Sequence, residues 1–214
     1  MKKIGKLLGL VILIFVMAGM ASAKTPGSNL LQKALNKLSG YKNFKANLVY
    51  SMDNKAMDIH EKKTGVIYVK GNSYRIEMGG QTIISNGKNS WTVLKDSKEV
   101  MLTAVDTTST SNVSPTSILS RFKNYKIHFE KKKGSRKSSI RTLILTTKKN
   151  TTFKKVTITL NVHTLLLKKF SMYDNDGNVF TYTITNLKPN LKLPAGTFEY
   201  IPKDFPGYSL EDMR

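Results

Sequence analysis

The chain has 214 residues, a length that suits one domain of ordinary size, and it contains no cysteine. The lack of cysteine excludes disulfide bonds, thiol chemistry and a lipoprotein-type leader. The 35 basic residues outnumber the 14 acidic ones and give a net charge of +21, which favours anionic partners and surfaces.

The first 23 residues have the pattern of an export signal. A basic start at residues 1–6 precedes the apolar run Leu7–Met20, and Ala21-Ser22-Ala23 has the small-x-small form of a cleavage site. The apolar run is shorter than the roughly 20 residues that a membrane-spanning helix needs. We therefore expect cleavage after Ala23, with residues 24–214 as one mature periplasmic domain. An uncleaved membrane anchor is the alternative.

The mature chain keeps a strong positive charge. Without Lys2, Lys3 and Lys6, the 32 remaining basic residues exceed the 14 acids by 18. Lysines are scattered through strand-like segments such as 130–137 and 146–150, which indicates a solvated outer sheet face. An exported chain rarely meets nucleic acid, so we expect transient contact with anionic membranes and no nucleic-acid partner.

A short amphipathic helix is expected over residues 28–40. Ser28 is a plausible N-cap and Gly40 a plausible stop. The apolar residues recur at helical spacing: Leu30, Leu31, Ala34, Leu35 and Leu38.

Alternating apolar and polar residues then predict a series of antiparallel strands. In 44–52 the residues that share one face are Phe44, Ala46, Leu48, Tyr50 and Met52. Further runs with the same alternation are 65–70, 74–78, 82–85, 90–94 and 99–104. Asn86-Gly87-Lys88 is a typical hairpin turn between two of them.

A second short helix is expected after residue 113. Ser114 can cap it and Pro115 suits its first position. Ile118, Leu119 and Phe122 would form its apolar stripe. Periodicity alone favours core packing for the stripes of both helices, and a lid over a cavity is the functional alternative.

Strand patterns return in the last third of the chain. The runs are 125–130, 141–146, 155–161, 166–173 and 179–186, with a hairpin turn at 174–178. The chain thus contains about ten strands, and a sheet of that size curls toward a barrel.

Motifs for catalysis and metal binding fail when they are tested. Gly87-Lys88 lacks the first glycine and the final Ser/Thr of a phosphate-binding loop, and His60-Glu61 has Thr64 where a zinc protease needs its second histidine. The three histidines show no ligand spacing. We therefore expect a protein that is not an enzyme, with no catalytic residue, cofactor or metal.

Five segments, in this order and spacing, resemble the LolA family of periplasmic carriers of outer-membrane lipoproteins. They are FKANLVY (44–50), GVIYVKGNSYRIEM (65–78), IISNGKNSW (83–91), SPTSILSR (114–121) and LPAGTFEYIP (193–202). The resemblance implies a mainly β fold in which one curved antiparallel sheet forms an unclosed barrel with the helices as its lid.

The resemblance also implies a function and partners. The protein would shield lipoprotein acyl chains in an apolar cavity while they move from the inner to the outer membrane. Its partners would be acylated lipoproteins, an inner-membrane ABC transporter of the lipoprotein-releasing type and an outer-membrane receptor, and the carrier would be a monomer.

The chain departs from the family pattern beside Lys70. Many members carry an Arg-Pro pair there, associated with closing the lid, whereas this chain continues with Gly71 and Asn72. Lys70 and Arg75 are the candidates to replace that arginine.

The residues expected to line the cavity come from both helices and the sheet. They are Leu31, Leu35, Leu38, Phe44, Leu48, Tyr50, Tyr68, Ile76, Trp91, Ile118, Leu119 and Phe122.

Two other functions stay open at this point. One is a related lipid- or lipoprotein-sensing module that regulates envelope stress, although such proteins usually carry a second domain for which this chain is short. The other is a hydrolase with an unrecognised site, which two or more titratable groups converging in the cavity would favour.

Overall fold

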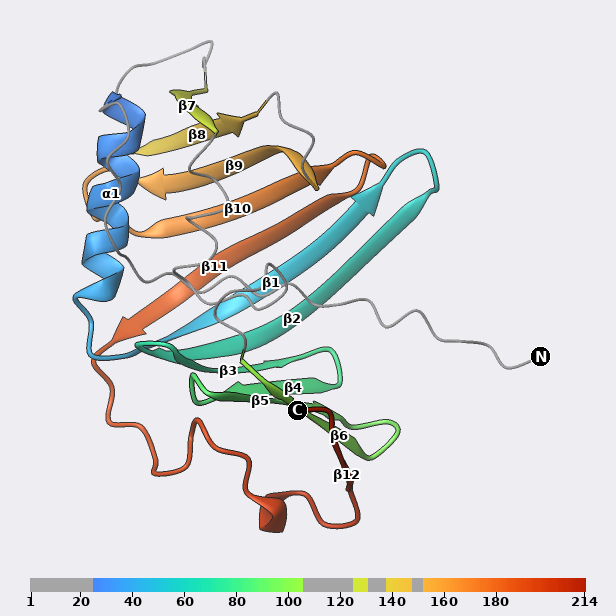
Figure 1. Cartoon of the computed structure of the whole chain (residues 1–214). Helices are drawn as coiled ribbons and strands as arrows, with labels where there is room; N and C mark the ends of the chain where they lie inside the picture. Colours follow the sequence, from blue (N-terminus) through green and yellow to red (C-terminus); the bar gives the residue numbers. More distant parts are fainter. Residues whose placement is uncertain (1–24, 106–124, 131–137, 148–151) are drawn as a thin grey trace.

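The computed structural model describes residues 25–105, 125–130, 138–147 and 152–214, and Figure 1 shows their arrangement. The predicted leader (1–23) and the predicted second helix, with Ile118, Leu119 and Phe122, lie outside the described residues. The described elements are α1 (Pro26–Ser39), β1 (Phe44–Asn54), β2 (Ile59–Lys70), β3 (Ser73–Met78), β4 (Gln81–Ser85), β5 (Asn89–Leu94), β6 (Glu99–Ala104), β7 (Lys126–Phe129), β8 (Ile140–Thr146), β9 (Phe153–Asn161), β10 (Leu167–Asp174), β11 (Val179–Pro189), a 3-10 turn (Pro202–Asp204) and β12 (Ser209–Asp212).

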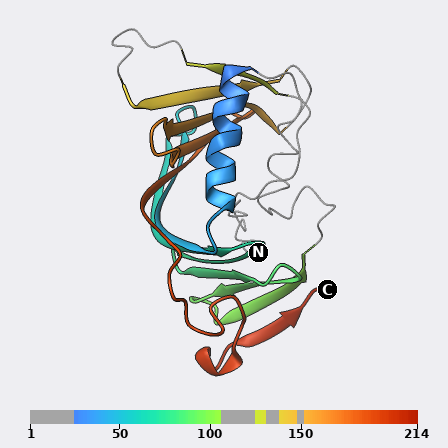
Figure 2. The same ribbon diagram turned by 90° about the vertical axis from the view of Figure 1, so that its left-hand side faces the viewer.

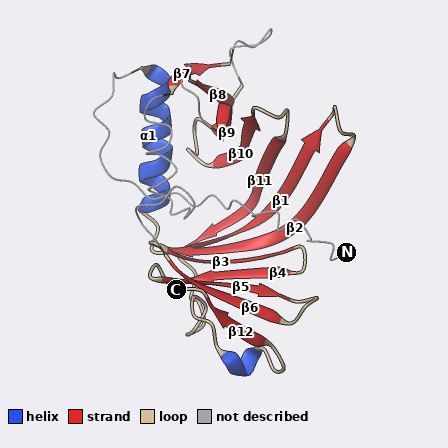
Figure 3. Ribbon diagram, turned by 45° about the vertical axis from the view of Figure 1, so that its right-hand side comes forward, coloured by secondary structure: helices blue, strands red, loops and turns tan. Residues whose placement is uncertain are grey.

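All twelve strands belong to one curved sheet that does not close. The strand order is β12-β6-β5-β4-β3-β2-β1-β11-β10-β9-β8-β7, so that β12 and β7 are the two edges of the described sheet. Figure 3 shows how far the sheet curls between these edges. Neighbouring strands are antiparallel except β6 and β12, which run parallel. The predicted mainly β fold with an unclosed, curved sheet is therefore confirmed.

Two strand predictions need correction. β2 begins at Ile59 and not at residue 65, because its first half continues the hairpin with β1 although it is rich in charged residues. β12 was not predicted at all. All four of its residues are exposed, so the segment has no apolar alternation that could reveal a strand.

The turns follow the predicted chemistry. The β4–β5 turn contains Gly87 with φ +87°, and the β10–β11 turn contains Gly177 with φ +84°. Only glycine adopts such backbone angles without a steric cost, so both turns can be tight. These turns fix the register of their hairpins, which determines the face on which each neighbouring side chain lies.

Helix α1 lies across the concave side of the sheet, as Figure 2 shows. Its N-cap is Thr25, whose hydroxyl accepts a hydrogen bond from the Ser28 backbone N–H, so the predicted cap at Ser28 is wrong by one turn. Pro26 suits the first helical position because the first turn leaves backbone N–H groups unpaired. The predicted end at Gly40 is confirmed, and the Gly40 N–H donates to the Asn36 carbonyl.

Apolar residues gather on both faces of the sheet. We call the face toward α1 the inner face; it carries Leu48, Tyr50 and Ile76, which belong to the same buried cluster as the helix residues. The opposite, outer face carries a second cluster on β4, β5 and β6, which we call the outer cluster. Its members are Ile84, Trp91, Val93, Val100 and Leu102, packed against Tyr200, Phe205 and Tyr208 of the C-terminal segment.

In the described part of the chain, no helix combines the length and the apolar character needed to span a bilayer.

Candidate functional site

The candidate site is the inner face of the sheet together with the apolar side of α1. Leu31, Leu35 and Leu38 lie on that side of the helix and are only 2–6% exposed. At its N-terminal end α1 approaches β7 and β8 closely, because Gly27 has no side chain to keep them apart. The helix stripe predicted from the sequence is thus directed toward the sheet.

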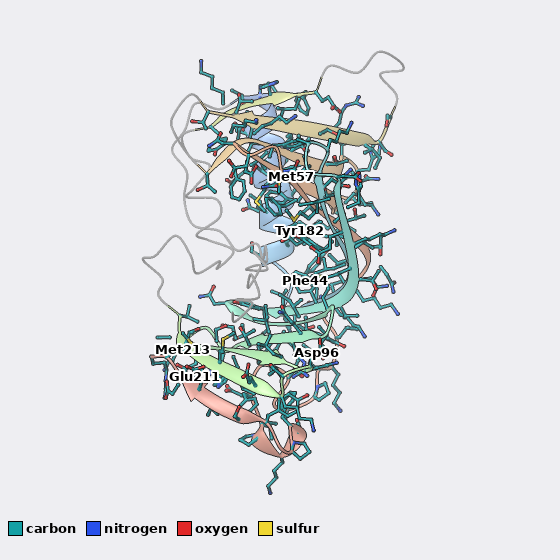
Figure 4. All side chains as sticks on the ribbon, turned by 90° about the vertical axis from the view of Figure 1, so that its right-hand side faces the viewer. Phe44, Met57, Asp96, Tyr182, Glu211 and Met213 are labelled. Carbon is teal, nitrogen blue, oxygen red and sulfur yellow. The ribbon has the colours of Figure 1, made fainter. Side chains whose placement is uncertain are left out.

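The sheet contributes the residues that face this stripe. Leu48 and Tyr50 of β1 and Ile76 of β3 are 5%, 3% and 1% exposed, and Phe44 is half-buried against the same cluster. The Tyr50 ring lies beside the Tyr182 ring of β11, with their centroids 5.3 Å apart. Figure 4 shows Phe44 and Tyr182 within the curve of the sheet, on the side of α1.

Sequence reasoning missed much of this apolar face. The alternation in β8–β11 indicated strands, but it did not show which face would meet α1. The further buried inner-face residues are Ala46, Met52, Ile67, Val69, Met78, Leu143, Leu145, Val156, Ile158, Leu160, Leu167, Phe170, Met172 and Tyr182. Three of them are methionines, whose unbranched side chains adapt to differently shaped neighbours.

Two predicted lining residues lie on the other face. Tyr68 pairs across the strands with Lys45 and Arg75 on the outer face, where the Lys45 Nζ lies 5.1 Å from the centre of its ring. Trp91 belongs to the outer cluster, and its ring stacks on Tyr200 with centroids 6.4 Å apart. Both assignments were wrong by one residue of register, which reverses the face of a strand side chain.

The two candidates for closing a lid also lie away from α1. Arg75 is on the outer face, and its Nε donates to the Glu77 Oε1 at 2.7 Å. Lys70 is exposed at the end of β2, on the same strand face as Tyr68. The sheet separates both cations from the helix, so neither position supports the predicted lid-closing contact.

Burial changes the acidity of the two inner-face tyrosines. It raises the pKa of Tyr50 to about 12, with a smaller contribution from the Glu61 carboxylate. Burial also raises the pKa of Tyr182, and the neighbouring Tyr50 adds to this effect. Both phenols therefore stay neutral at physiological pH, as suits an apolar surface.

The described residues include no group of three or more His, Asp or Glu side chains that could hold a metal ion. What the inner face offers is a large, mostly apolar cluster of buried aliphatic, methionine and neutral tyrosine side chains. Such a surface can exclude water from a hydrocarbon ligand.

A model of the family described as outer membrane lipoprotein carrier protein LolA matches residues 39–201. No curated protein matches the sequence.

Several solved structures share the fold. One is an uncharacterised conserved protein from Thermus thermophilus, 11% identical, with a TM-score of 0.57, 86% of this chain covered and 98% of the other. A second is the lipoprotein LppX of Mycobacterium tuberculosis, 14% identical, with a TM-score of 0.51 and coverage of 78% and 98%. A more remote likeness is to a LolA superfamily protein from Nitrosomonas europaea, 13% identical, with a TM-score of 0.43 and coverage of 83% and 99%.

Proposed function

The chain belongs to the LolA family of outer membrane lipoprotein carrier proteins, and from this premise we propose that it carries acylated lipoproteins across the periplasm. The observation that carries this proposal is the large, mostly apolar cluster on the inner face, to which the stripe of α1 belongs. In the proposed complex, the acyl chains of the cargo lie against this face, between the sheet and the helix.

The hydrophobic effect explains why such a carrier is needed. Each CH₂ group that leaves a membrane for water costs about 0.8 kcal/mol, so an acyl chain cannot cross an aqueous compartment unaided. The inner face can replace the membrane for those chains. The residues that we propose contact them are Leu31, Leu35, Leu38, Phe44, Leu48, Tyr50 and Ile76, joined by Ile67, Val69 and the inner-face methionines.

Cargo must also be released, which requires an element that can move. We propose that α1 is this element, because it is a single helix laid over a sheet whose strands are joined to one another by backbone hydrogen bonds. Displacement of α1 would open the apolar face and leave the sheet ladder intact. In this scheme an ABC transporter in the inner membrane loads the carrier, and a receptor in the outer membrane accepts the cargo.

Export is part of the same proposal. We propose that the leader is removed after Ala23 and that the mature protein, with its charge of +18, adheres weakly to anionic membranes. Intact mass of the protein from the periplasmic fraction tests the cleavage, since a species that retains residues 1–23 in the membrane contradicts it. Release from anionic vesicles by salt tests the adhesion, because screening weakens contacts between exposed charges.

The decisive test of function is the identity of what the protein binds in its own cell. We propose to purify the chain with its native leader from the periplasm and to analyse bound molecules by mass spectrometry. Acylated peptides or intact lipoproteins should copurify with the wild type, and the Leu35→Glu variant purified in parallel should lack them. If wild type and Leu35→Glu copurify with the same molecules, the inner face is not the binding site.

A further inference from the structure

Two oppositely charged side chains interrupt the apolar inner face on strand β2. The alternation of β2 places Glu61 and Lys63 on the inner face with Ile67, and places Lys62 on the outer face. The Lys63 Nζ lies 2.5 Å from the Glu61 Oε1. The pair occurs where the face would otherwise continue as an apolar surface.

The neighbours of the pair are buried and mostly apolar. Lys63 lies opposite Tyr50 across the strands, and Glu61 lies opposite Met52. The aliphatic part of Lys63 packs over Gly79, where an added Cβ would be 2.6 Å from the Lys63 Cδ. The Lys63 and Glu61 side chains keep 37% and 31% of their surface exposed. The stem of Lys63 is thus held in place, while the side chain as a whole remains partly exposed.

Stability does not account for this pair. A partly exposed ion pair contributes roughly 0–1 kcal/mol, because solvation and side-chain entropy offset the attraction. Its position, however, divides the inner face of β2 into two parts. Ile67 and Val69 lie at the end of the strand near α1, and Lys63 lies about 13 Å further along, toward the β1–β2 turn. The inner face of β2 is therefore apolar at Ile67 and Val69 near the helix and charged at Lys63 and Glu61, with Ile59 beyond the pair at the turn.

The charged pair on an otherwise apolar face suits an amphiphilic ligand whose polar end lies at Lys63 and whose hydrocarbon part extends toward α1. An acyl chain ends in a carboxylate or in the carbonyl of an ester or amide, so every such ligand has a hydrogen-bond acceptor at its polar end. An ammonium group has three N–H donors, of which Glu61 engages one. Lys63 can therefore donate to a ligand while it stays paired.

We propose that Lys63 binds the carboxylate or carbonyl oxygen at the polar end of an acyl chain whose hydrocarbon part extends toward α1. Glu61 is a positioning residue, because it holds the ammonium group at this boundary and competes with the ligand for it. The assignment rests on the proposed function, in that it requires an acyl chain on the inner face. A free fatty acid and an acylated peptide would share this contact.

The test uses calorimetric titration of the mature protein with three ligands of equal chain length. These are palmitate, an N-palmitoylated peptide and hexadecyltrimethylammonium, each below the concentration at which it aggregates. Lys63→Met should weaken palmitate binding about tenfold, since it removes a charge-assisted hydrogen bond. The same variant should leave binding of the ammonium ligand unchanged or stronger. Methionine keeps the unbranched stem that packs over Gly79.

Two control variants separate the contact from general charge effects. Lys62→Met removes the same charge from the outer face of the same strand and should leave all three affinities at wild-type values. Glu61→Gln should strengthen palmitate binding, because it removes a competing acceptor and a negative charge. A loss confined to palmitate assigns the contact to free carboxylates, and a loss with both acyl ligands extends it to acylated peptides.

Other outcomes overturn the assignment. Unchanged palmitate and peptide affinities in Lys63→Met, equal losses in Lys62→Met, or equal weakening of all three ligands would each contradict the contact. A wild-type protein that binds none of the three ligands would instead contradict the proposed function itself. The two failures are therefore distinguishable.

Discussion

A Cβ atom built on Gly27 at the start of α1 would lie 3.2 Å from the Cδ2 of Leu143 on β8 and equally close to the Cγ2 of Ile127 on β7. The helix therefore rests directly on the sheet at this end, with no side chain of its own between them. Because the packing is close here, added atoms at Gly27 should disturb the contact between the N-terminal end of α1 and the sheet.

Replacement of Gly27 by leucine should lift this end of the helix. Overpacking in a buried contact typically costs about 1–3 kcal/mol. We expect this cost to weaken the packing of α1 against the sheet. We expect a lower melting temperature and faster exchange of a fluorescent fatty acid, measured by calorimetry and stopped-flow displacement. Asn29→Leu, at an exposed position of the same turn, is the control. Equal effects of the two variants would contradict close packing between Gly27 and the sheet.

Asn54 joins the tips of two hairpins. The side chain is 1% exposed; its Nδ2 donates to the Asp176 carbonyl and to the Asn178 Oδ1, and its Oδ1 accepts from the backbone N–H groups of Ala56 and Met57. Asn54→Ala should lower the free energy of unfolding by about 1–3 kcal/mol, because it leaves buried partners unpaired.

Urea unfolding measures the effect of Asn54→Ala. Asn47→Ala is the matched control, since Asn47 is exposed on the same strand. A midpoint shift for Asn54→Ala no larger than that for Asn47→Ala would show that the two hairpin tips are not held together by this side chain.

The raised pKa of Tyr50, about 12, predicts a loss of stability in alkaline solution. An unfolded tyrosine titrates near pH ~10, so the folded protein holds the phenol proton more tightly. The contribution of the protonated Tyr50 phenol to the free energy of unfolding is complete below about pH 10 and is lost as the pH rises through about 12.

Tyr50→Phe removes this proton, so the free energy of unfolding of the variant should fall less steeply over that range. Tyr182 keeps its own titration and leaves a residual slope, because its pKa is raised as well. Urea midpoints measured in steps across this pH range provide the comparison. Identical slopes for wild type and variant would contradict the burial of an ionisable phenol at position 50.

Trp91 is the only tryptophan of the chain, and its place on the outer face makes it a reporter for the C-terminal segment. Acyl ligands should leave its fluorescence unchanged, because the sheet separates it from the inner face. Tyr200→Ala should shift its emission, since the Tyr200 ring stacks on it. A ligand-induced shift of similar size in the wild type would place the bound ligand at the outer cluster.

The positions of the strands could be predicted from the sequence better than the sheet face on which each side chain lies. Alternation in β1 placed Leu48 and Tyr50 correctly, because one face of β1 is apolar and the other is mostly polar. Trp91 was misplaced because the alternation of β5 is equally compatible with either face. Its position depends on Tyr200, Phe205 and Tyr208, more than 100 residues later in the chain.

The site was predictable on the helix and only partly on the sheet. The stripe of α1 follows from local periodicity, whereas the inner-face role of Ile67 depends on pairing with β1 and β3. The charged pair at Glu61 and Lys63 was hidden by the charge of residues 60–63, which does not look like a strand. Pairing between strands decides such positions, and a single sequence contains no direct signal for it.

The central claim is that α1 covers an acyl-binding face and is not a fixed part of the core. Leu35, 2% exposed at the middle of the helix stripe, gives the most direct test. In Leu35→Glu the account predicts that α1 swings out to hydrate the carboxylate, so binding of a fluorescent fatty acid is lost while the sheet keeps most of its thermal stability. Asn36→Glu, on the exposed side of the helix, should change neither property. Unfolding of the whole domain in Leu35→Glu, by the several kcal/mol expected for an unpaired charge in a packed core, or unchanged fatty-acid binding would contradict the account.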